Sequence, residues 1–138
     1  MPKGGVVVIG MGAMIRMLGG QNDAAKLVES VGKKIASVKV DGDVLRFDME
    51  DGSTFGLTDM AQSCCESRHM SCDDDLTKFT GAEFRGARIA DGPRKDDEYG
   101  YCDDSQFLIV ETSLGEFTVV NHNEHNGYYG GFSMEVVP

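Results

Sequence analysis

An internal repeat is the feature that most constrains the fold of this 138-residue chain. The spacing of apolar residues and glycine that follows Leu27 recurs after Leu76. The matched pairs are Leu27/Leu76, Gly32/Gly81, Ile35/Phe84, Val38/Ala87 and Val40/Ile89. Further matches begin at Val44 and Phe107, and each is followed after the same interval by a glycine, Gly52 or Gly115. The pattern favours a duplication with halves 23–72 and 73–136, although two unrelated meanders with chance similarity would also produce it.

Each half predicts a short helix followed by three strands. The helices are expected over about Ala24–Ser30, after an N-cap at Asn22 or Asp23, and from Leu76 onward, after Asp73–Asp75. The expected strands are Ile35–Val40, Val44–Glu50, Thr54–Thr58, Glu83–Ala90, Gln106–Thr112, Glu116–His122 and a last strand, Phe132–Val136. Tight turns such as Asp41-Gly42-Asp43 join strands that pair antiparallel. The predicted fold class is therefore α+β, a meandering antiparallel sheet with short helices.

The chain is expected to contain one α+β domain, residues 23–138, behind an N-terminal extension of residues 1–22. Val6–Gly12 is similar to a dinucleotide-binding loop, but Ile15 occupies the third glycine position. An insert rich in charge and glycine, Asp91–Ser105, predicts a solvated loop. The alternative is a lid over a cleft, to which Tyr99 or Tyr101 would contribute.

The charge balance excludes several classes of partner. Acidic residues outnumber basic residues 23 to 13, which gives a net charge of -10. Nucleic acids and anionic membranes attract clustered Lys and Arg, so neither is an expected partner. No apolar run is long enough to span a bilayer. The four cysteines, two of them adjacent, are expected to be reduced thiols in a cytoplasm.

The segment Asn121–Phe132 is dense in hydrogen-bonding groups and aromatic rings. Its candidate ligand-binding residues are His122, His125, Asn126, Tyr128 and Tyr129. A tyrosine ring beside amide and imidazole groups suits stacking on a base and hydrogen bonds to ribose. The alternative is a polar hairpin whose tyrosines pack on the protein itself.

A second motif runs from Cys64 to Cys72, and it allows three interpretations. Zinc would need Cys65, His69 and Cys72, with His122 or His125 as a fourth ligand. A cysteine nucleophile would need His125 as base and Glu124 to orient it. In the favoured interpretation the thiols of Cys64 and Cys65 are partly buried, and Glu66 and Arg68 hold the opposite loop. We therefore expect no metal, no cofactor and no catalytic residue.

The two motifs follow equivalent strands of the two halves, which is why they are assigned to one site. If a pseudo-two-fold axis relates the halves, the motifs would occupy matching rims of one cleft. The candidate ligand-binding residues are Cys64, Cys65, Glu66, Arg68, His122, His125, Asn126, Tyr128 and Tyr129, with Tyr99 and Tyr101 as lid candidates.

Three short anchors give the chain a family resemblance: Gln62–Glu66, Asp97–Tyr99 and Asn126–Tyr129. With these residues the chain resembles a small, largely uncharacterised domain found in phages, prophages and bacteria, over about Leu27–Met134. That domain is distantly similar to phage anti-defence proteins that block Thoeris immunity. The resemblance implies a homo-oligomer that binds a cyclic ADP-ribose signal without cleaving it. The chain departs from those proteins in its extension and in its acidity, because a pyrophosphate needs cations or backbone N–H groups.

Two other functions remain open at this stage. An acidic surface would suit a protein-binding inhibitor that imitates DNA or docks on a basic nuclease, provided that its carboxylates cluster on one face. A zinc- or cysteine-dependent hydrolase would use the residues of the second motif. The resemblance makes sequestration of a small nucleotide-like ligand the expected function.

Overall fold

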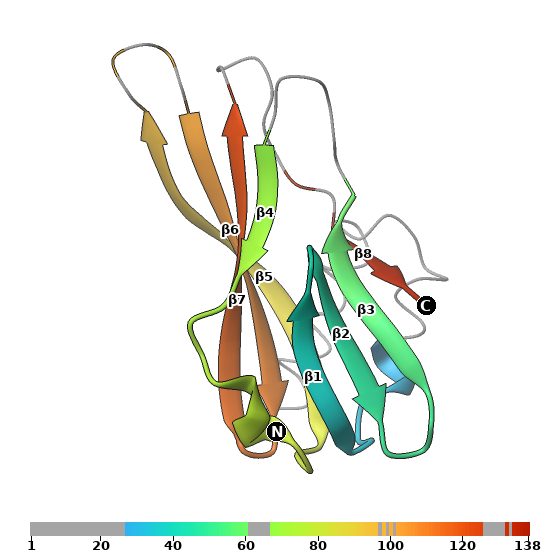
Figure 1. Cartoon of the computed structure of the whole chain (residues 1–138). Coiled ribbons are helices and arrows are strands. Elements are labelled where there is room, and N and C mark those ends of the chain that lie inside the picture. The colour runs from blue at the N-terminus through green and yellow to red at the C-terminus, as the bar shows by residue number, and fades with distance from the viewer. Residues whose placement is uncertain are drawn as a thin grey trace.

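The computed structural model describes residues 27–60, 67–96, 98, 100, 102–125, 132 and 134–138. Its strands are β1 (Ile35–Asp41), β2 (Val44–Met49), β3 (Thr54–Asp59), β4 (Ser67–Ser71), β5 (Phe84–Asp96), β6 (Cys102–Thr112), β7 (Gly115–His125) and β8 (Met134–Val137). They form two four-stranded sheets in which every neighbouring pair is antiparallel. The first sheet has the order β1-β2-β3-β8 and the second the order β4-β7-β6-β5 (Figure 1).

The fold is mostly β, so the predicted α+β class was wrong. Within the described residues, helical conformation is limited to Leu27–Glu29 and to the 3-10 turn η1 (Leu76–Phe79). Each of these short stretches is soon followed by a glycine with positive φ, Gly32 at 91° and Gly81 at 87°. A left-handed glycine ends a helix, and the chain then pairs as β structure instead of adding helical turns.

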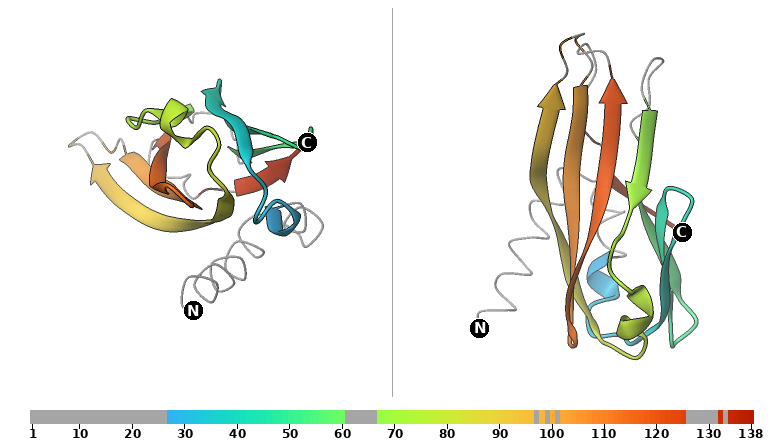
Figure 2. Two further views of the ribbon diagram at one scale, coloured as in Figure 1. Left: turned by 90° about the horizontal axis from the view of Figure 1, so that it is seen from below. Right: turned by 60° about the vertical axis from the view of Figure 1, so that its left-hand side comes forward.

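The two three-strand meanders lie where the sequence places them, but the predicted single sheet does not form. The polar insert Asp91–Ser105 is not a loop over most of its length. Its residues extend β5 to Asp96 and begin β6 at Cys102, with a register irregularity between Asp91 and Arg94. Figure 2 shows the resulting long strands reaching beyond the first sheet.

The last strand of each half belongs to the sheet of the other half. β4 follows β3 in the chain but pairs with β7, whereas β8 follows β7 but pairs with β3. β4 was not predicted, because its five residues, Ser67–Ser71, show no simple alternation of apolar and polar types. Each sheet therefore contains three consecutive strands of one half and one strand from the other.

The halves meet through reciprocal backbone hydrogen bonds at repeat-equivalent positions. The N–H of Gly32 donates to the carbonyl of Phe84, and the N–H of Gly81 donates to that of Ile35, both at 2.7 Å. A second reciprocal pair joins Ile35 N–H to Ala82 O at 2.8 Å and Phe84 N–H to Lys33 O at 2.9 Å. The matched bonds relate the halves by a pseudo-two-fold axis, while a duplication as their origin stays an interpretation.

A single hydrophobic core lies between the lower parts of the two sheets. Phe47 and Phe55 of the first sheet stack at 4.6 Å between ring centroids, and Phe84 meets both edge-on at 5.5 Å. Phe117 of β7 lies 6.5 Å from Phe47, which brings the second sheet into the same cluster. Such pairs add to the stabilisation that burial itself provides.

The expected extension, residues 1–22, and the first three residues of the first expected helix, 24–26, lie outside the described residues. No helix within the described part of the chain is long and apolar enough to cross a membrane.

Candidate functional site

The inner face of the second sheet changes from apolar to polar partway along its strands. On β7 the buried residues run from Phe117 and Val119 to Asn121, Asn123 and His125. On β6 the inward positions change from Val110 and Leu108 to Gln106 and Asp104, and Cys102 follows as a buried thiol. We call the polar residues the inner polar ladder: Asn121, Asn123, His125, Gln106 and Asp104. They occupy positions that β-sheet cores normally fill with apolar side chains.

The inner polar ladder is deeply buried and partly bonded within itself. Asn121, Asn123 and His125 are 2 %, 0 % and 1 % exposed. Nε2 of His125 lies 2.7 Å from Oδ2 of Asp104, and Nδ2 of Asn121 donates to Sδ of Met134 at 3.4 Å. Oε1 of Gln106 is buried and accepts no hydrogen bond from the residues that the structure describes.

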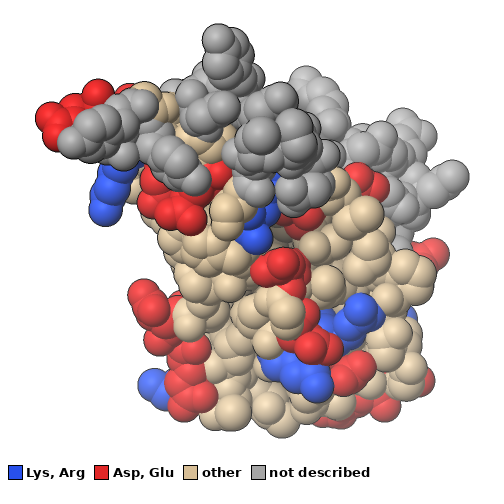
Figure 3. Space-filling view, turned by 45° about the horizontal axis from the view of Figure 1, so that its top comes forward, with Lys and Arg blue, Asp and Glu red and all other residues tan. Residues whose placement is uncertain are grey.

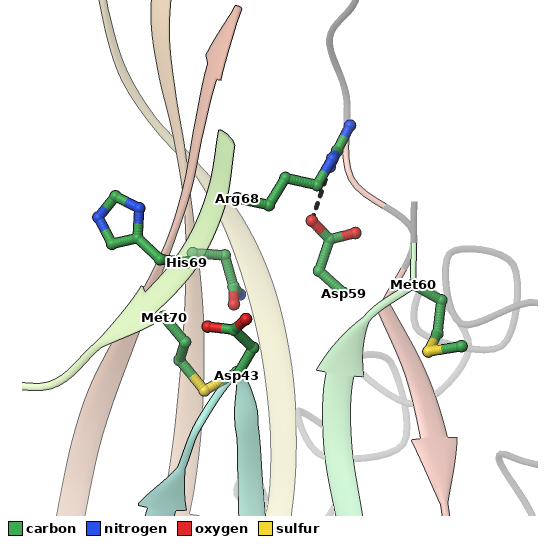
Figure 4. A pocket seen from close by; sticks show the side chains of 7 residues that line it. Asp43, Asp59, Met60, Arg68, His69 and Met70 are labelled. Atoms are coloured by element: carbon green, nitrogen blue, oxygen red, sulfur yellow. Dashed lines mark hydrogen bonds and ion pairs between the residues drawn. The ribbon is translucent and has the colours of Figure 1, made fainter. Parts of the chain in front are cut away.

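A buried ion pair joins the two sheets beside this ladder. Arg68 Nη1, near the start of β4, lies 2.6 Å from Asp59 Oδ2 at the end of β3, and both side chains are 8 % exposed. The guanidinium carbon also lies 5.8 Å from the centroid of the Phe132 ring. Because β3 and β4 belong to different sheets, the pair fixes the distance between the sheets at their polar end (Figure 4).

A cavity of about 260 Å³ lies at this end of the molecule. Its lining comes from both sheets: Asp43, Asp59, Met60, Arg68, His69, Met70 and Asn121. Figure 4 shows Arg68 reaching across to Asp59, and the ring of His69 turned away from them. The backbone carbonyl of Asp43 accepts a hydrogen bond of 2.7 Å from Thr58 Oγ1, which anchors the β1–β2 turn at the rim of the cavity.

The lining carries more negative than positive charge, because it contains two carboxylates and one guanidinium. On the face of the molecule that Figure 3 shows, acidic and basic side chains are interspersed. On that face the carboxylates do not form the single-sign patch that the DNA-mimic hypothesis requires.

Three of the candidate ligand-binding residues are described by the structure, and they lie on opposite faces of the second sheet. Arg68 lines the cavity, and His125 is buried on the same inner side. His122 lies on the outer side, where its ring stacks on that of His69 at 4.4 Å and its Nε2 lies 3.0 Å from Ser71 Oγ. Burial, followed by the nearby charge of His69, lowers the pKa of His122. The structure thus brings Arg68 and His125 to one side of the sheet and places His122 on the other.

The remaining candidates lie outside the described residues: Cys64, Cys65, Glu66, Asn126, Tyr128, Tyr129, Tyr99 and Tyr101. The described residues that flank the two motifs are paired with each other. Ser67 is the strand partner of Glu124, and Asp59 is the strand partner of Met134.

Parts of the two catalytic alternatives fall within the described residues, although Cys65 does not. His69 faces outward with His122, whereas Cys72 packs against the hydrophobic core, so the two do not converge on one metal ion. Within the described ranges no group of three or more His, Cys, Asp or Glu side chains is placed to hold a metal. Glu124 and His125 are consecutive strand residues that point to opposite faces, so Glu124 does not orient His125; Asp104 does.

Several residues of this region were not predicted from the sequence: Asp43, Asp59, Asp104, Gln106 and Asn121. Asn121, Asn123 and His125 recur at every second position of β7, and this spacing is enough to predict one polar face of the strand. Asp43 and Asp59 gave no such signal, because their places at the cavity depend on how the sheets pack.

These observations define the chain as a mostly-β protein of two sheets, with an open cavity of mixed polar and apolar lining that both sheets contribute to. The chain belongs to the family described as a domain of unknown function, DUF7448, which matches residues 28–134. The match confirms the resemblance to an uncharacterised domain over nearly the expected range. No curated protein and no solved structure matches the chain.

Proposed function

We propose that the protein is a binding protein that holds a small, nucleotide-like polar ligand between its two sheets without altering it. The observation that carries the proposal is the cavity at the polar end of the molecule, lined from both sheets and adjoining the inner polar ladder. Ligand sites are typically concave and contain a few convergent polar groups on a rigid scaffold.

The energetic cost of the inner polar ladder supports this proposal. A buried polar group that lacks a hydrogen bond costs about 1–3 kcal/mol, and an apolar side chain at the same position would avoid that cost. Oε1 of Gln106 is such a group among the described residues. Leucine at position 106 would extend the core that Leu108 and Val119 begin, so the unpaired oxygen of Gln106 is a cost to stability that a binding role would account for.

The lining favours the base and ribose of a nucleotide over its phosphates. Carboxylate and amide groups, here those of Asp43, Asp59 and Asn121, bind hydroxyl and amino groups well. Phosphates need free cations or backbone N–H groups, and the guanidinium of Arg68 is already paired with Asp59. We therefore propose that the donor-rich part of the ligand faces the described lining.

The resemblance extends the proposal to a biological role. We propose a phage-type anti-defence protein that sequesters a cyclic ADP-ribose-like signal in the cytoplasm of a bacterial cell, as a homo-oligomer. Light scattering at micromolar concentration tests the oligomer, and a mass equal to that of one 14.9 kDa chain overturns it.

Retention of intact ligand tests the binding function. The purified protein is mixed with cyclic ADP-ribose isomers, ADP-ribose and adenosine, and the retained fraction is denatured and analysed by mass spectrometry. We expect at least one compound to be retained and recovered with unchanged mass. Recovery of a cleaved product overturns the non-catalytic proposal, and retention no higher than in a protein-free blank overturns binding of these compounds.

Two matched substitutions assign the binding to the cavity. Met60 lines the cavity and is 54 % exposed, so Met60→Trp fills space there with little cost to the core. Leu114 is 63 % exposed and lies in the β6–β7 turn, where Leu114→Trp serves as the control. We expect retention to fall with Met60→Trp and to be unchanged with Leu114→Trp. Equal retention by the two variants contradicts a ligand in the cavity.

A further inference from the structure

We propose that the free main-chain edge of β4 recognises the base of the ligand, a planar heteroaromatic ring that carries a hydrogen-bond donor and an acceptor side by side, as adenine does. The inference rests on the proposed binding function and adds the group by which the cavity selects its ligand. It depends on the place of β4 at the edge of the second sheet, on the residues of β4 that line the cavity, and on two methionines from different sheets.

Three consecutive residues of β4 line the cavity: Arg68, His69 and Met70. Successive side chains of a strand point to opposite faces of its sheet, so side chains alone would bring only every second residue to one cavity. The ring of His69 is turned away from the Arg68–Asp59 pair (Figure 4) and stacks on that of His122 on the outer side. His69 therefore contributes its backbone and not its ring, and the cavity lies along an edge of β4.

That edge is the unpaired side of the strand. β4 is the outermost strand of the second sheet, and β7 is its only strand partner among the described residues. Within the same part of the chain, His69 and Met70 make no backbone hydrogen bond outside this pairing. In an antiparallel pair, every second residue of an edge strand directs both its N–H and its C=O away from the neighbouring strand. One of these two residues therefore presents a donor beside an acceptor at the cavity.

Two methionines give the cavity apolar surface from both sheets. Met60 follows the end of β3 and is 54 % exposed, whereas Met70 lies on β4 and is 7 % exposed. Figure 4 shows Met70 on the side of β4 and Met60 on the side of β3. A thioether makes favourable contacts with an aromatic ring. The lining thus offers apolar contacts for the face of a planar ring next to hydrogen-bonding groups for its edge.

A nucleobase fits this combination better than a sugar or a phosphate does. Adenine carries an exocyclic amino group beside a ring nitrogen, so it donates to a main-chain carbonyl and accepts from the neighbouring N–H at the same time. A ribose or a phosphate has no flat apolar face for the methionines. The inference concerns the base alone, so it agrees with a nucleotide that also carries phosphates.

Titration calorimetry with matched probes tests the recognition of the base. The probes are ADP-ribose, adenosine, purine riboside and ribose 5-phosphate. Purine riboside keeps the ring and the sugar of adenosine but lacks the amino group, and it adds no bulk. We expect ADP-ribose and adenosine to bind with one site per chain, and purine riboside to bind about tenfold more weakly than adenosine, because a main-chain carbonyl of β4 is then left without its donor.

Amide hydrogen exchange followed by NMR tests the main-chain contact itself. With the tighter of adenosine and ADP-ribose at saturation, we expect the amide of His69 or Met70 to exchange about tenfold more slowly or less. The control is β1, an edge strand of the first sheet whose residues do not line the cavity, and the amides of Lys39 and Val40 should change by less than about twofold. Equal slowing at the two strands, or none at β4, overturns the contact with β4.

The remaining outcomes separate this inference from the proposed function. If purine riboside binds as tightly as adenosine, recognition of the base edge is wrong and the binding function stands. If ribose 5-phosphate binds and adenosine does not, the cavity holds the sugar and the phosphate, and this inference falls alone. If none of the four probes binds, both the inference and the proposed function for this cavity fall.

Discussion

Arg68 and Asp59 form an ion pair of 2.6 Å between the start of β4 and the end of β3, and both side chains are almost completely buried. The two residues are close in sequence, yet the strands that carry them belong to different sheets. The pair thus spans the place where the chain leaves one sheet for the other, and the same pair forms one wall of the cavity. Stability and binding are therefore coupled at this position.

Substitution of either member of this pair should strongly destabilise the fold. Arg68→Met leaves the Asp59 carboxylate buried without its guanidinium, which typically costs about 3–5 kcal/mol of unfolding free energy. The double variant Asp59→Leu/Arg68→Met should recover most of that loss, since an apolar pair needs no desolvation of charge. Urea unfolding followed by circular dichroism measures the three free energies.

A partly exposed lysine before β1 provides the control. Lys33 Nζ lies 2.9 Å from Oδ2 of Asp51, and the two side chains are 34 % and 49 % exposed. Lys33→Met should therefore change the unfolding free energy by less than about 1 kcal/mol. Similar losses for Arg68→Met and Lys33→Met would show that the inter-sheet pair has no special structural role.

His122 should titrate below the ordinary histidine range in the folded protein. Burial and the charge of His69 lower its pKa from 6.5, so at a pH just below 6.5 the unfolded chain binds more protons than the folded chain at this residue. The contribution of His122 to stability is therefore constant above about pH 7.5 and decreases as the pH falls through 6.5 toward the folded pKa. Histidine NMR titration gives the pKa directly.

Substitution of His69, whose ring stacks on that of His122, tests the cause of the lowered pKa. His69→Gln removes a positive charge next to His122, so the pKa of His122 should rise but stay below 6.5, because burial is the larger cause. In His122→Gln, the loss of unfolding free energy between about pH 7.5 and 5 should be smaller than in the wild type. A wild-type pKa of His122 at or above 6.5 would contradict the packing described for the outer face.

The sequence predicts the local parts of this fold well and the global arrangement poorly. Alternation of Leu45, Phe47 and Met49 with polar residues fixes one buried face of β2, and the turn after Asp41 sets its pairing with β1. These signals are local, since they depend on neighbours in the chain. The same is true of Asn121 and Asn123, whose two-residue spacing is enough to mark one polar face of β7.

Features that depend on contacts between the halves could not be predicted from these patterns. Ser67–Ser71 becomes a strand only because β7 offers a free edge, and β8 completes the first sheet in the same way. The cavity depends on Asp43 and Asp59, whose positions follow from that exchange of strands. The helix expected at Leu76 failed for a local reason, since Gly81 limits it to the short turn η1.

The two repeat-equivalent glycines should respond alike to substitution. Gly32 and Gly81 have φ values of 91° and 87°, and an added Cβ would meet no atom within 4 Å at either position. Alanine should therefore cost only backbone strain, about 1–2 kcal/mol at each site. Guanidinium unfolding of Gly32→Ala and Gly81→Ala measures both losses, and Gly→Asn should cost less because asparagine tolerates this conformation. Losses that differ by more than about 1 kcal/mol would argue against equivalent roles in the two halves.

Gly56 in the middle of β3 permits a close approach that alanine would prevent. A Cβ on this residue would lie 2.6 Å from Cγ1 of Val44 and 3.0 Å from Cγ2 of Val137, so Gly56→Ala should cost about 1–3 kcal/mol of unfolding free energy through overpacking. Val44→Ala removes the nearer methyl group, and the double variant should therefore be less destabilised than the sum of the two single variants. A double-mutant cycle measured by urea unfolding checks this coupling. Additive losses would show that the strain arises elsewhere, at Val137 or in the backbone of β3.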